Sequence, residues 1–167
     1  TQRFKTLLQG NVDAIYFNEK LYIGKREEVF VYNESTGNFD LFYHLAGKNI
    51  TLSCLHLDKN KNLWLGTTSN GIYCLSEDKN LSRPVTKGNI TSIYEDSSNE
   101  LWIGSWEEGL YRVKTDGSIE NLRHNPMNTN SLCSNFVRSC CEDNSGDLWI
   151  GTFNGLNRYD RDRKSVV

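Results

Sequence analysis

The chain has 167 residues, and its acidic and basic side chains are interspersed, with a net charge of −2. This balance argues against nucleic-acid binding, which needs a concentrated basic face. Neither a long apolar run nor a basic amphipathic stretch indicates direct insertion into a membrane. The sequence begins at Thr1 without a Met and stops abruptly at Val167, so we interpret both ends as cuts in a longer protein.

One pattern occurs four times along the chain. Each copy has two aliphatic-type residues three apart, a short turn, and a Leu-aromatic-aliphatic-Gly segment. These segments end at Gly24, Gly66, Gly104 and Gly151, a spacing of roughly 40 residues that is typical of repeat architectures. We place the repeats approximately at residues 9–48, 49–87, 88–133 and 134–167, with residues 1–8 as the outer strand of a neighbouring or ring-closing unit.

The first repeat is the least regular, because Val29 stands where the later repeats have a glycine. Its fourth strand is predicted at Phe39–Tyr43. The second repeat serves as the template, and its polar turn begins at Asp58. Its predicted strands are Thr51–Leu57, Leu63–Gly66, Gly71–Leu75 and about Leu81–Val85.

The third repeat ends with a predicted strand at Ile119–Leu122. The polar, turn-rich stretch that follows, His124–Asn135, is interpreted as an inserted loop. In the fourth repeat the third strand is predicted at Gly155–Tyr159, and no clear fourth strand follows. No segment has a sustained helical period, so no helix is predicted.

The alternation within the second strand of each repeat predicts the fold. In the third repeat, Leu101 and Ile103 point to one side and Trp102 to the other. Both sides are large and apolar, so both must be covered. We therefore predict an all-β fold, a β-propeller of four-stranded antiparallel blades with about four blades' worth of strands. The N-terminal strand would close a small ring in one alternative; in the favoured one the chain is a fragment of a larger ring.

Seven residues of the repeat are assigned structural roles. The tryptophans and the tyrosine are expected in the packing between blades. Each glycine is expected to end its strand where a side chain would crowd a neighbouring backbone. These residues are Trp64, Trp102, Trp149, Gly66, Gly104, Gly151 and Tyr159.

The sequence indicates no catalytic group, metal site or cofactor. Asp58 opens a segment that reads like the start of a calcium loop, but Leu63 and Ser69 stand where that loop needs a glycine and an acid. A turn role is therefore expected. The five cysteines give no disulfide framework and are expected to be mostly small buried hydrophobes, and the three histidines form no zinc pattern.

The segment LWIGTFNGLNRYD at Leu148–Asp160, preceded by EDNSGD, resembles the two-component regulator propeller repeat. The fourth repeat matches that pattern nearly throughout, the second and third in part, and the first only loosely. Such repeats usually build the periplasmic sensor half of hybrid two-component systems in polysaccharide-degrading bacteria. There, paired seven-bladed propellers and a small β-sandwich precede a transmembrane helix, a histidine kinase and a DNA-binding regulator. The resemblance implies a fragment of a seven-bladed type of propeller, whose ligand is a glycan fragment.

The loops between the second and third strands are the candidate ligand site, because they vary while the strands stay fixed. Trp106 and Phe153 are candidates for stacking on sugar rings. Hydrogen bonds to sugar hydroxyls are expected from Arg26, Glu107, Glu108 and Asn154. Packing of the aromatics between blades and solvation of the charges is the alternative for each of these residues.

The expected function is that of a non-enzymatic, periplasmic sensor segment that responds to oligosaccharides. Its expected partners are neighbouring blades and sensor domains of the same protein, and the open ends predict a homo-oligomer. A propeller scaffold that binds protein partners without a small ligand is the alternative function, and a propeller lyase is a third.

Overall fold

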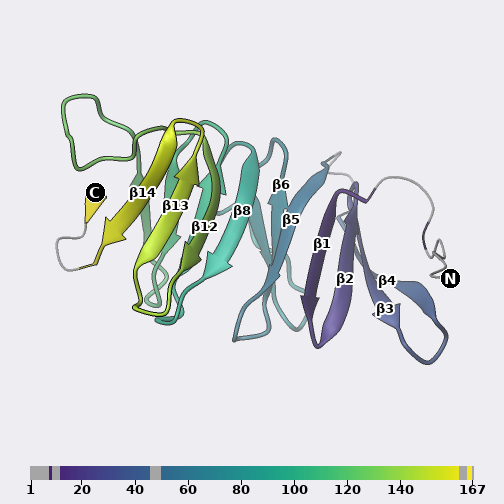
Figure 1. The fold of residues 1–167 in the computed structure, drawn as a ribbon. Coiled ribbons are helices and arrows are strands. Elements are labelled where there is room, and N and C mark those ends of the chain that lie inside the picture. Colours follow the sequence, from purple (N-terminus) through teal and green to yellow (C-terminus); the bar gives the residue numbers. More distant parts are fainter. Residues whose placement is uncertain (1–7, 9–11, 46–49, 162–164, 167) are drawn as a thin grey trace, which may run out of the picture.

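The computed structural model describes residues 8, 12–45, 50–161 and 165–166. Fifteen strands and no helix are found in this part of the chain. It accordingly contains no helix of the length and apolarity needed to cross a membrane. The strands form four antiparallel sheets that follow one another in a row, which we call blades 1 to 4 (Figure 1).

The strands of each blade are consecutive in sequence and pair in order. Blade 1 contains β1 (Ala14–Asn18), β2 (Lys20–Lys25), β3 (Glu28–Asn33) and β4 (Asn38–His44). Blade 2 contains β5 (Leu52–Leu57), β6 (Leu63–Thr67) and β7 (Ile72–Leu75). Blade 3 contains β8 (Ile90–Glu95), β9 (Leu101–Ser105), β10 (Leu110–Val113) and β11 (Ile119–Leu122). Blade 4 contains β12 (Val137–Glu142), β13 (Leu148–Thr152), β14 (Gly155–Asp160) and β15 (Ser165–Val166).

The all-β propeller prediction is confirmed, with two corrections to the strands. Leu81–Val85 is not a strand, since only Leu81 forms a bridge, with Leu75. Pro84 has no amide hydrogen to donate to a ladder, and the hydroxyl of Ser82 accepts the Cys74 amide at 2.9 Å in place of a backbone carbonyl. The fourth strand missed in blade 4 is β15, which is too short to show an alternating pattern. The strand expected at the start of the chain lies almost entirely outside the described residues.

Each Trp-bearing strand is held to the turn before it by an aspartate. In blade 3, the Asp96 carboxylate accepts the indole N–H of Trp102 at 2.8 Å and the backbone amides of Ser98 and Glu100, both at 2.9 Å. The same indole hydrogen bond, again 2.8 Å long, joins Asp58 to Trp64 and Asp143 to Trp149. The expected turn role of these aspartates is confirmed, and the constant six-residue spacing to the tryptophan now has a physical reason.

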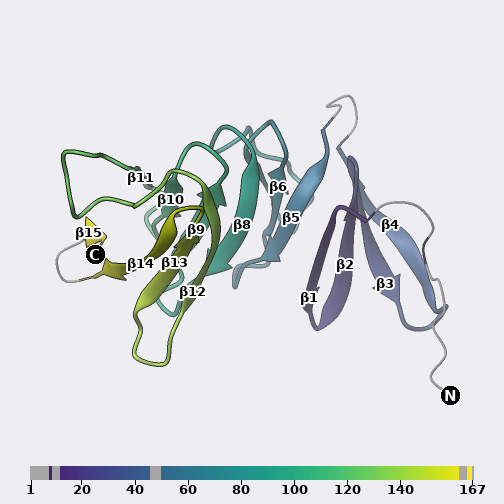
Figure 2. The same cartoon turned by 45° about the horizontal axis from the view of Figure 1, so that its top comes forward.

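The two apolar sides of each second strand pack against different neighbours. Leu63 and Leu65 lie in the core shared with blade 1, whereas Trp64 lies in the core shared with blade 3. Trp102 is fully buried in the next core, against blade 4. The predicted two-sided burial is therefore confirmed for blades 2 and 3, and Figure 2 shows the sheets standing face to face in the same order.

The glycine one residue before the end of the second strand makes room for the next blade. A Cβ on Gly66 would lie 2.9 Å from Cγ2 of Ile90, and a Cβ on Gly104 would lie 2.9 Å from Cγ1 of Val137. Ile90 and Val137 are the first residues of the first strands of the following blades. The sequence prediction placed a neighbouring backbone at this point. The close contact across the blades is instead with a side chain, because Ile90 and Val137 point into the inter-blade core.

Candidate functional site

An aromatic cluster lies where the β9–β10 and β13–β14 turns meet the start of β12. The ring centroids of Trp106 and Phe136 are 5.5 Å apart, and those of Phe136 and Phe153 are 6.2 Å apart. The Arg138 guanidinium lies 5.1 Å from the Trp106 ring centre and 5.8 Å from that of Phe153. We call these four residues the aromatic cluster. Three rings and one cation from blades 3 and 4 thus share one surface.

The repeat itself positions the two turns that carry Trp106 and Phe153. The Ser105 hydroxyl donates to the Gly109 carbonyl at 2.9 Å and accepts the Glu108 amide at 2.8 Å, closing the β9–β10 turn. In blade 4 the Thr152 hydroxyl donates to the Gly155 carbonyl at 3.0 Å. The backbone amides of Trp106 and Phe153 are fixed by the carbonyls of the residues before β8 and β12, each at 2.9 Å. The rings therefore project from turns with a defined backbone.

The cluster is open to solvent. Phe153 is 65% exposed, Arg138 is exposed, and Trp106 and Phe136 are half-buried. Aromatic faces combined with a nearby cation and polar turn groups are the chemistry of sites that bind a ligand with an apolar face and a polar rim. The cluster therefore has the composition and exposure of a binding surface.

The predicted site residues divide into those at the cluster and one that is remote. Glu108 forms an ion pair with Arg123, and the Glu107 backbone carbonyl accepts a hydrogen bond from the same arginine at 3.3 Å. Asn154 is exposed beside Phe153, and its backbone amide donates to the turn hydroxyl of Thr152. Arg26 lies in the β2–β3 turn of blade 1, two blades from Trp106. The structure thus groups five of the six candidates and separates Arg26 from them.

Sequence reasoning missed two members of the cluster, Phe136 and Arg138. Both flank Val137, and the corresponding positions before and after the first residue of β8 hold Asn89 and Thr91. The replacement of small or polar residues by a ring and a cation in one repeat only was the available signal. It was passed over because the prediction considered only the loops between the second and third strands.

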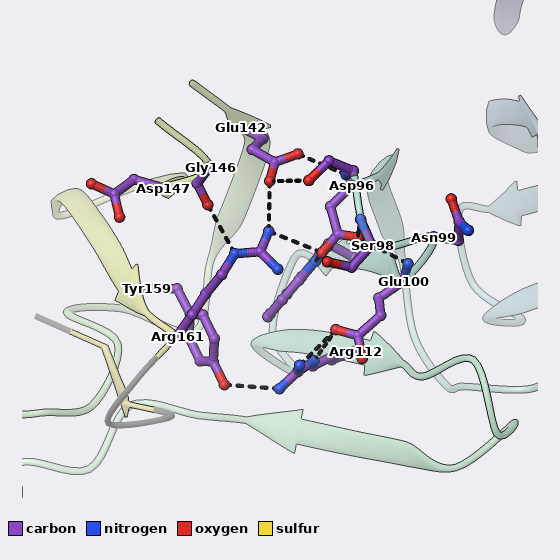
Figure 3. A network of polar contacts seen from close by, with 12 residues as sticks. Asp96, Ser98, Asn99, Glu100, Arg112, Glu142, Gly146, Asp147, Tyr159 and Arg161 are labelled. Carbon is purple, nitrogen blue, oxygen red and sulfur yellow. Dashed lines mark hydrogen bonds and ion pairs between the residues drawn. The ribbon is translucent and has the colours of Figure 1, made fainter. Parts of the chain in front are cut away.

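A second polar cluster ties blade 3 to blade 4 (Figure 3). The Arg161 guanidinium donates to the Asp96 carboxylate at 3.1 Å, to the Glu142 carboxylate at 2.9 Å and to the Gly146 carbonyl at 2.8 Å. Burial by itself raises the pKa of the Asp96 carboxyl, but the hydrogen bonds from Trp102 and the backbone and the charge of Arg161 lower it overall. The groups of this cluster satisfy one another, so we assign it a structural role.

The remaining reactive side chains have structural environments as well. All five cysteines are free thiols. Burial raises the pKa of Cys54 and Cys140 to about 12 and that of Cys74 to about 11, so these three are protonated, small hydrophobic residues. All three are partly buried and pack against the inter-blade cores, so the expected packing role is supported there but full burial is not. Cys141 is exposed on the opposite side of β12 from Cys140.

The comparisons with known proteins agree with this architecture. The sequence pattern of the two component regulator propeller matches residues 44–69, 84–107 and 131–154. These three segments contain the first and second strands of blades 2, 3 and 4. No curated protein matches the sequence.

Solved structures similar to this chain include two extracellular domains described as parts of hybrid two component systems of Bacteroides thetaiotaomicron. One is 21% identical, with a TM-score of 0.73 over 93% of this chain and 21% of its own. The other is 27% identical, with a TM-score of 0.68 over 83% of this chain and 18% of its own. This chain therefore spans about a fifth of the length of these domains.

A virginiamycin B lyase from Staphylococcus aureus, a catalytically inactive form with quinupristin, is also similar in fold. It is 16% identical, with a TM-score of 0.72 over 93% of this chain and 54% of its own. At this identity the likeness shows the fold alone. The matched sequence pattern, by contrast, contains the Asp turn and the Trp strand of three blades. Three segments of this chain, one in each of blades 2, 3 and 4, are therefore similar to the two component regulator propeller repeat.

Proposed function

We propose that this chain is a non-enzymatic, ligand-binding segment of the periplasmic sensor region of a hybrid two-component system. It binds an oligosaccharide and contributes to a signal that reaches a histidine kinase in the parent protein. The family of the repeat and the extracellular neighbours support the sensor role. A ligand that binds one arrangement of the blades more tightly than another shifts the population between them, and this is the physical basis of signalling.

The observation that carries the ligand class is the exposed aromatic cluster. A sugar ring has an apolar C–H face and a rim of hydroxyl groups. Trp106 and Phe153 offer two faces for the C–H side, and Arg138, Glu107 and Asn154 stand beside them with donors and acceptors for hydroxyl groups. The spacing of the rings over two blades favours an oligosaccharide over a single sugar.

The test is calorimetric titration of the chain with a panel of glycan fragments. We expect one panel member to bind, and Trp106→Ala and Phe153→Ala each to weaken its binding by about tenfold or more. Asn144→Ala, an exposed residue in the β12–β13 turn at the opposite end of blade 4, is the matched control and should leave binding unchanged. Binding that survives both aromatic substitutions would place the site elsewhere.

Two alternative functions have distinct signatures in the same experiment. Silence across the panel, together with co-purification of a protein partner, favours an interaction scaffold. Turnover of a glycan favours a lyase. The histidines are engaged locally: His44 contacts Glu27 at 3.3 Å, and His124 contacts the Leu132 carbonyl at 2.6 Å. His56 packs edge-on against Tyr16 and lies 3.5 Å from Glu95 between blades. These contacts support the non-enzymatic proposal.

A further inference from the structure

Arg138 stands at a position where the two preceding blades have a hydroxyl residue that joins one blade to the next. The pairing of the first two strands skips one residue in each of blades 2, 3 and 4, namely Ser53, Thr91 and Arg138. The Ser53 hydroxyl donates to the Ile90 carbonyl at 2.5 Å, and the Thr91 hydroxyl donates to the Val137 carbonyl at 2.7 Å. Such a skipped residue re-aims its side chain, and in blade 4 that side chain is long and cationic.

The position of the Arg138 side chain is set by two blades of this chain. Its guanidinium lies over the Trp106 ring of blade 3 and over the Phe153 ring of blade 4. Both rings belong to turns that join a second strand to a third strand. The cation is therefore held at the junction of blades 3 and 4, between the two rings that are proposed to stack on a sugar.

Arg112 shows the surroundings of an arginine that has a structural role in the same pair of blades. It also lies over two rings, those of Trp102 and Tyr159. Its guanidinium is paired with Glu100 at 2.6 Å and donates to the Tyr159 hydroxyl at 2.9 Å. Arg138 has the two rings without the acid, because no hydrogen bond or ion pair among the described residues uses its N–H groups.

The acidic residues of the β9–β10 turn do not neutralise Arg138 either. The Glu108 carboxylate is paired with Arg123, and Glu107 is exposed and forms no ion pair with Arg138 in the part of the chain that the structure describes. The aromatic cluster thus contains a positioned positive charge whose hydrogen-bond donors are available to a ligand.

We infer that the oligosaccharide bound at the aromatic cluster carries an anionic group, a carboxylate or a sulfate, and that Arg138 binds this group. The inference rests on the proposed function and narrows its ligand class. A planar guanidinium donates two parallel hydrogen bonds to such an anion. The ring faces beside it exclude water from part of the ion pair, which strengthens the attraction between the charges.

The test is calorimetric titration of the chain with a panel of glycan fragments that contains matched pairs. Each uronate oligosaccharide is paired with its methyl ester, and each sulfated oligosaccharide with its desulfated form, so the two arms separate a carboxylate from a sulfate. Neutral oligosaccharides complete the panel. We expect the tightest ligand to be an anionic member that binds about tenfold or more tighter than its neutral form. This binding should weaken as the salt concentration rises.

Substitutions at Arg138 then assign the preference to this residue. Arg138→Gln removes the charge and keeps an amide that donates to hydroxyl groups, so we expect it to weaken the anionic member by about tenfold or more and the neutral member by less. Arg138→Lys keeps the charge without the planar fork and should retain part of the preference. Arg83→Gln removes another exposed positive charge, in the β7–β8 loop, and is the control that should leave the preference unchanged.

The contrary outcomes separate this inference from the proposed function. A neutral tightest ligand whose binding is lost in Trp106→Ala and kept in Arg138→Gln overturns the inference and leaves the proposed function standing. So does a preference for the anionic member that survives Arg138→Gln, because its charge would then be bound elsewhere. Silence across the whole panel overturns the proposed function and this inference with it.

Discussion

At the scale of single residues, the hydrogen bond from tryptophan to aspartate is the signature of this repeat. It occurs in blades 2, 3 and 4 with the same atoms and the same 2.8 Å length. A buried indole N–H needs an acceptor, and a carboxylate that also accepts turn amides is a strong one. The pair therefore fixes both the turn and the orientation of the ring that fills the inter-blade core.

Trp102 and Trp149 are a matched pair for measuring what the next blade contributes. Trp102 is fully covered by blade 4, whereas Trp149 is half-buried on the last blade. We expect Trp102→Ala to lower the free energy of unfolding by about 3–5 kcal/mol and Trp149→Ala by less than about half of that. Urea unfolding at low protein concentration measures both, and equal losses would contradict the assigned packing.

The Asp96 carboxyl gives a prediction for acid stability. Its pKa in the folded chain is below the ordinary value of 3.8. The unfolded state therefore binds the proton first, so the carboxylate stabilises the fold fully above that value and progressively loses this contribution as the pH falls below it. We expect Asp96→Asn to be less stable than the unchanged chain at pH 7 and to show a smaller further loss at lower pH. Urea unfolding at a series of pH values tests this, and parallel pH profiles for the two chains would refute it.

At the scale of strands and turns, the glycine two residues after the strand tryptophan is more crowded in blade 3, which packs against blade 4, than in blade 4 itself. A Cβ on Gly104 would lie 2.5 Å from the Ser92 hydroxyl in addition to its contact with blade 4. Among the described residues, a Cβ on Gly151 would meet only Ser139 of its own blade, with the hydroxyl at 3.0 Å. We expect Gly104→Ala to destabilise by about 1–3 kcal/mol and Gly151→Ala to change stability by within about 0.5 kcal/mol. Thermal unfolding of the two variants is the comparison. A larger effect at Gly151 would argue that the blades are stacked in another way.

The strands were predictable where the repeat is regular and not where it breaks. The boundaries of β11 match the prediction, and those of β5 and β6 differ by one residue. Leu81–Val85 was overpredicted because apolar residues there suggested a strand that Pro84 prevents. The strand β15 was missed because two residues have no periodicity to detect.

The candidate site was predictable only in outline. The variable turns identified Trp106 and Phe153, and the structure brings them together through Phe136. Arg26 was grouped with them because equivalent loops lie at the same end of a propeller. Loops at the same end can still be far apart when they belong to blades that are not neighbours around the propeller axis. Contacts between blades depend on the rotation from one blade to the next, which a sequence does not display.

At the scale of the whole molecule, the chain is a row of sheets in which blades 2, 3 and 4 each cover the aromatic residue on the second strand of the blade before, namely Tyr22, Trp64 and Trp102. Cores lie between blades 1 and 2, 2 and 3, and 3 and 4. The free energy of unfolding is therefore approximately the sum of a contribution from each blade and a contribution from each interface between neighbouring blades, as in other repeat proteins.

Collisional quenching of tryptophan fluorescence by acrylamide tests this stacking most directly. The chain and its Trp102→Phe and Trp149→Phe variants are compared in dilute solution, so that each difference isolates one indole. The stacking predicts that Trp102 is blue-shifted and almost unquenched, because it is fully buried, and that Trp149 is red-shifted and readily quenched. A readily quenched Trp102 would contradict the face-to-face packing of the blades.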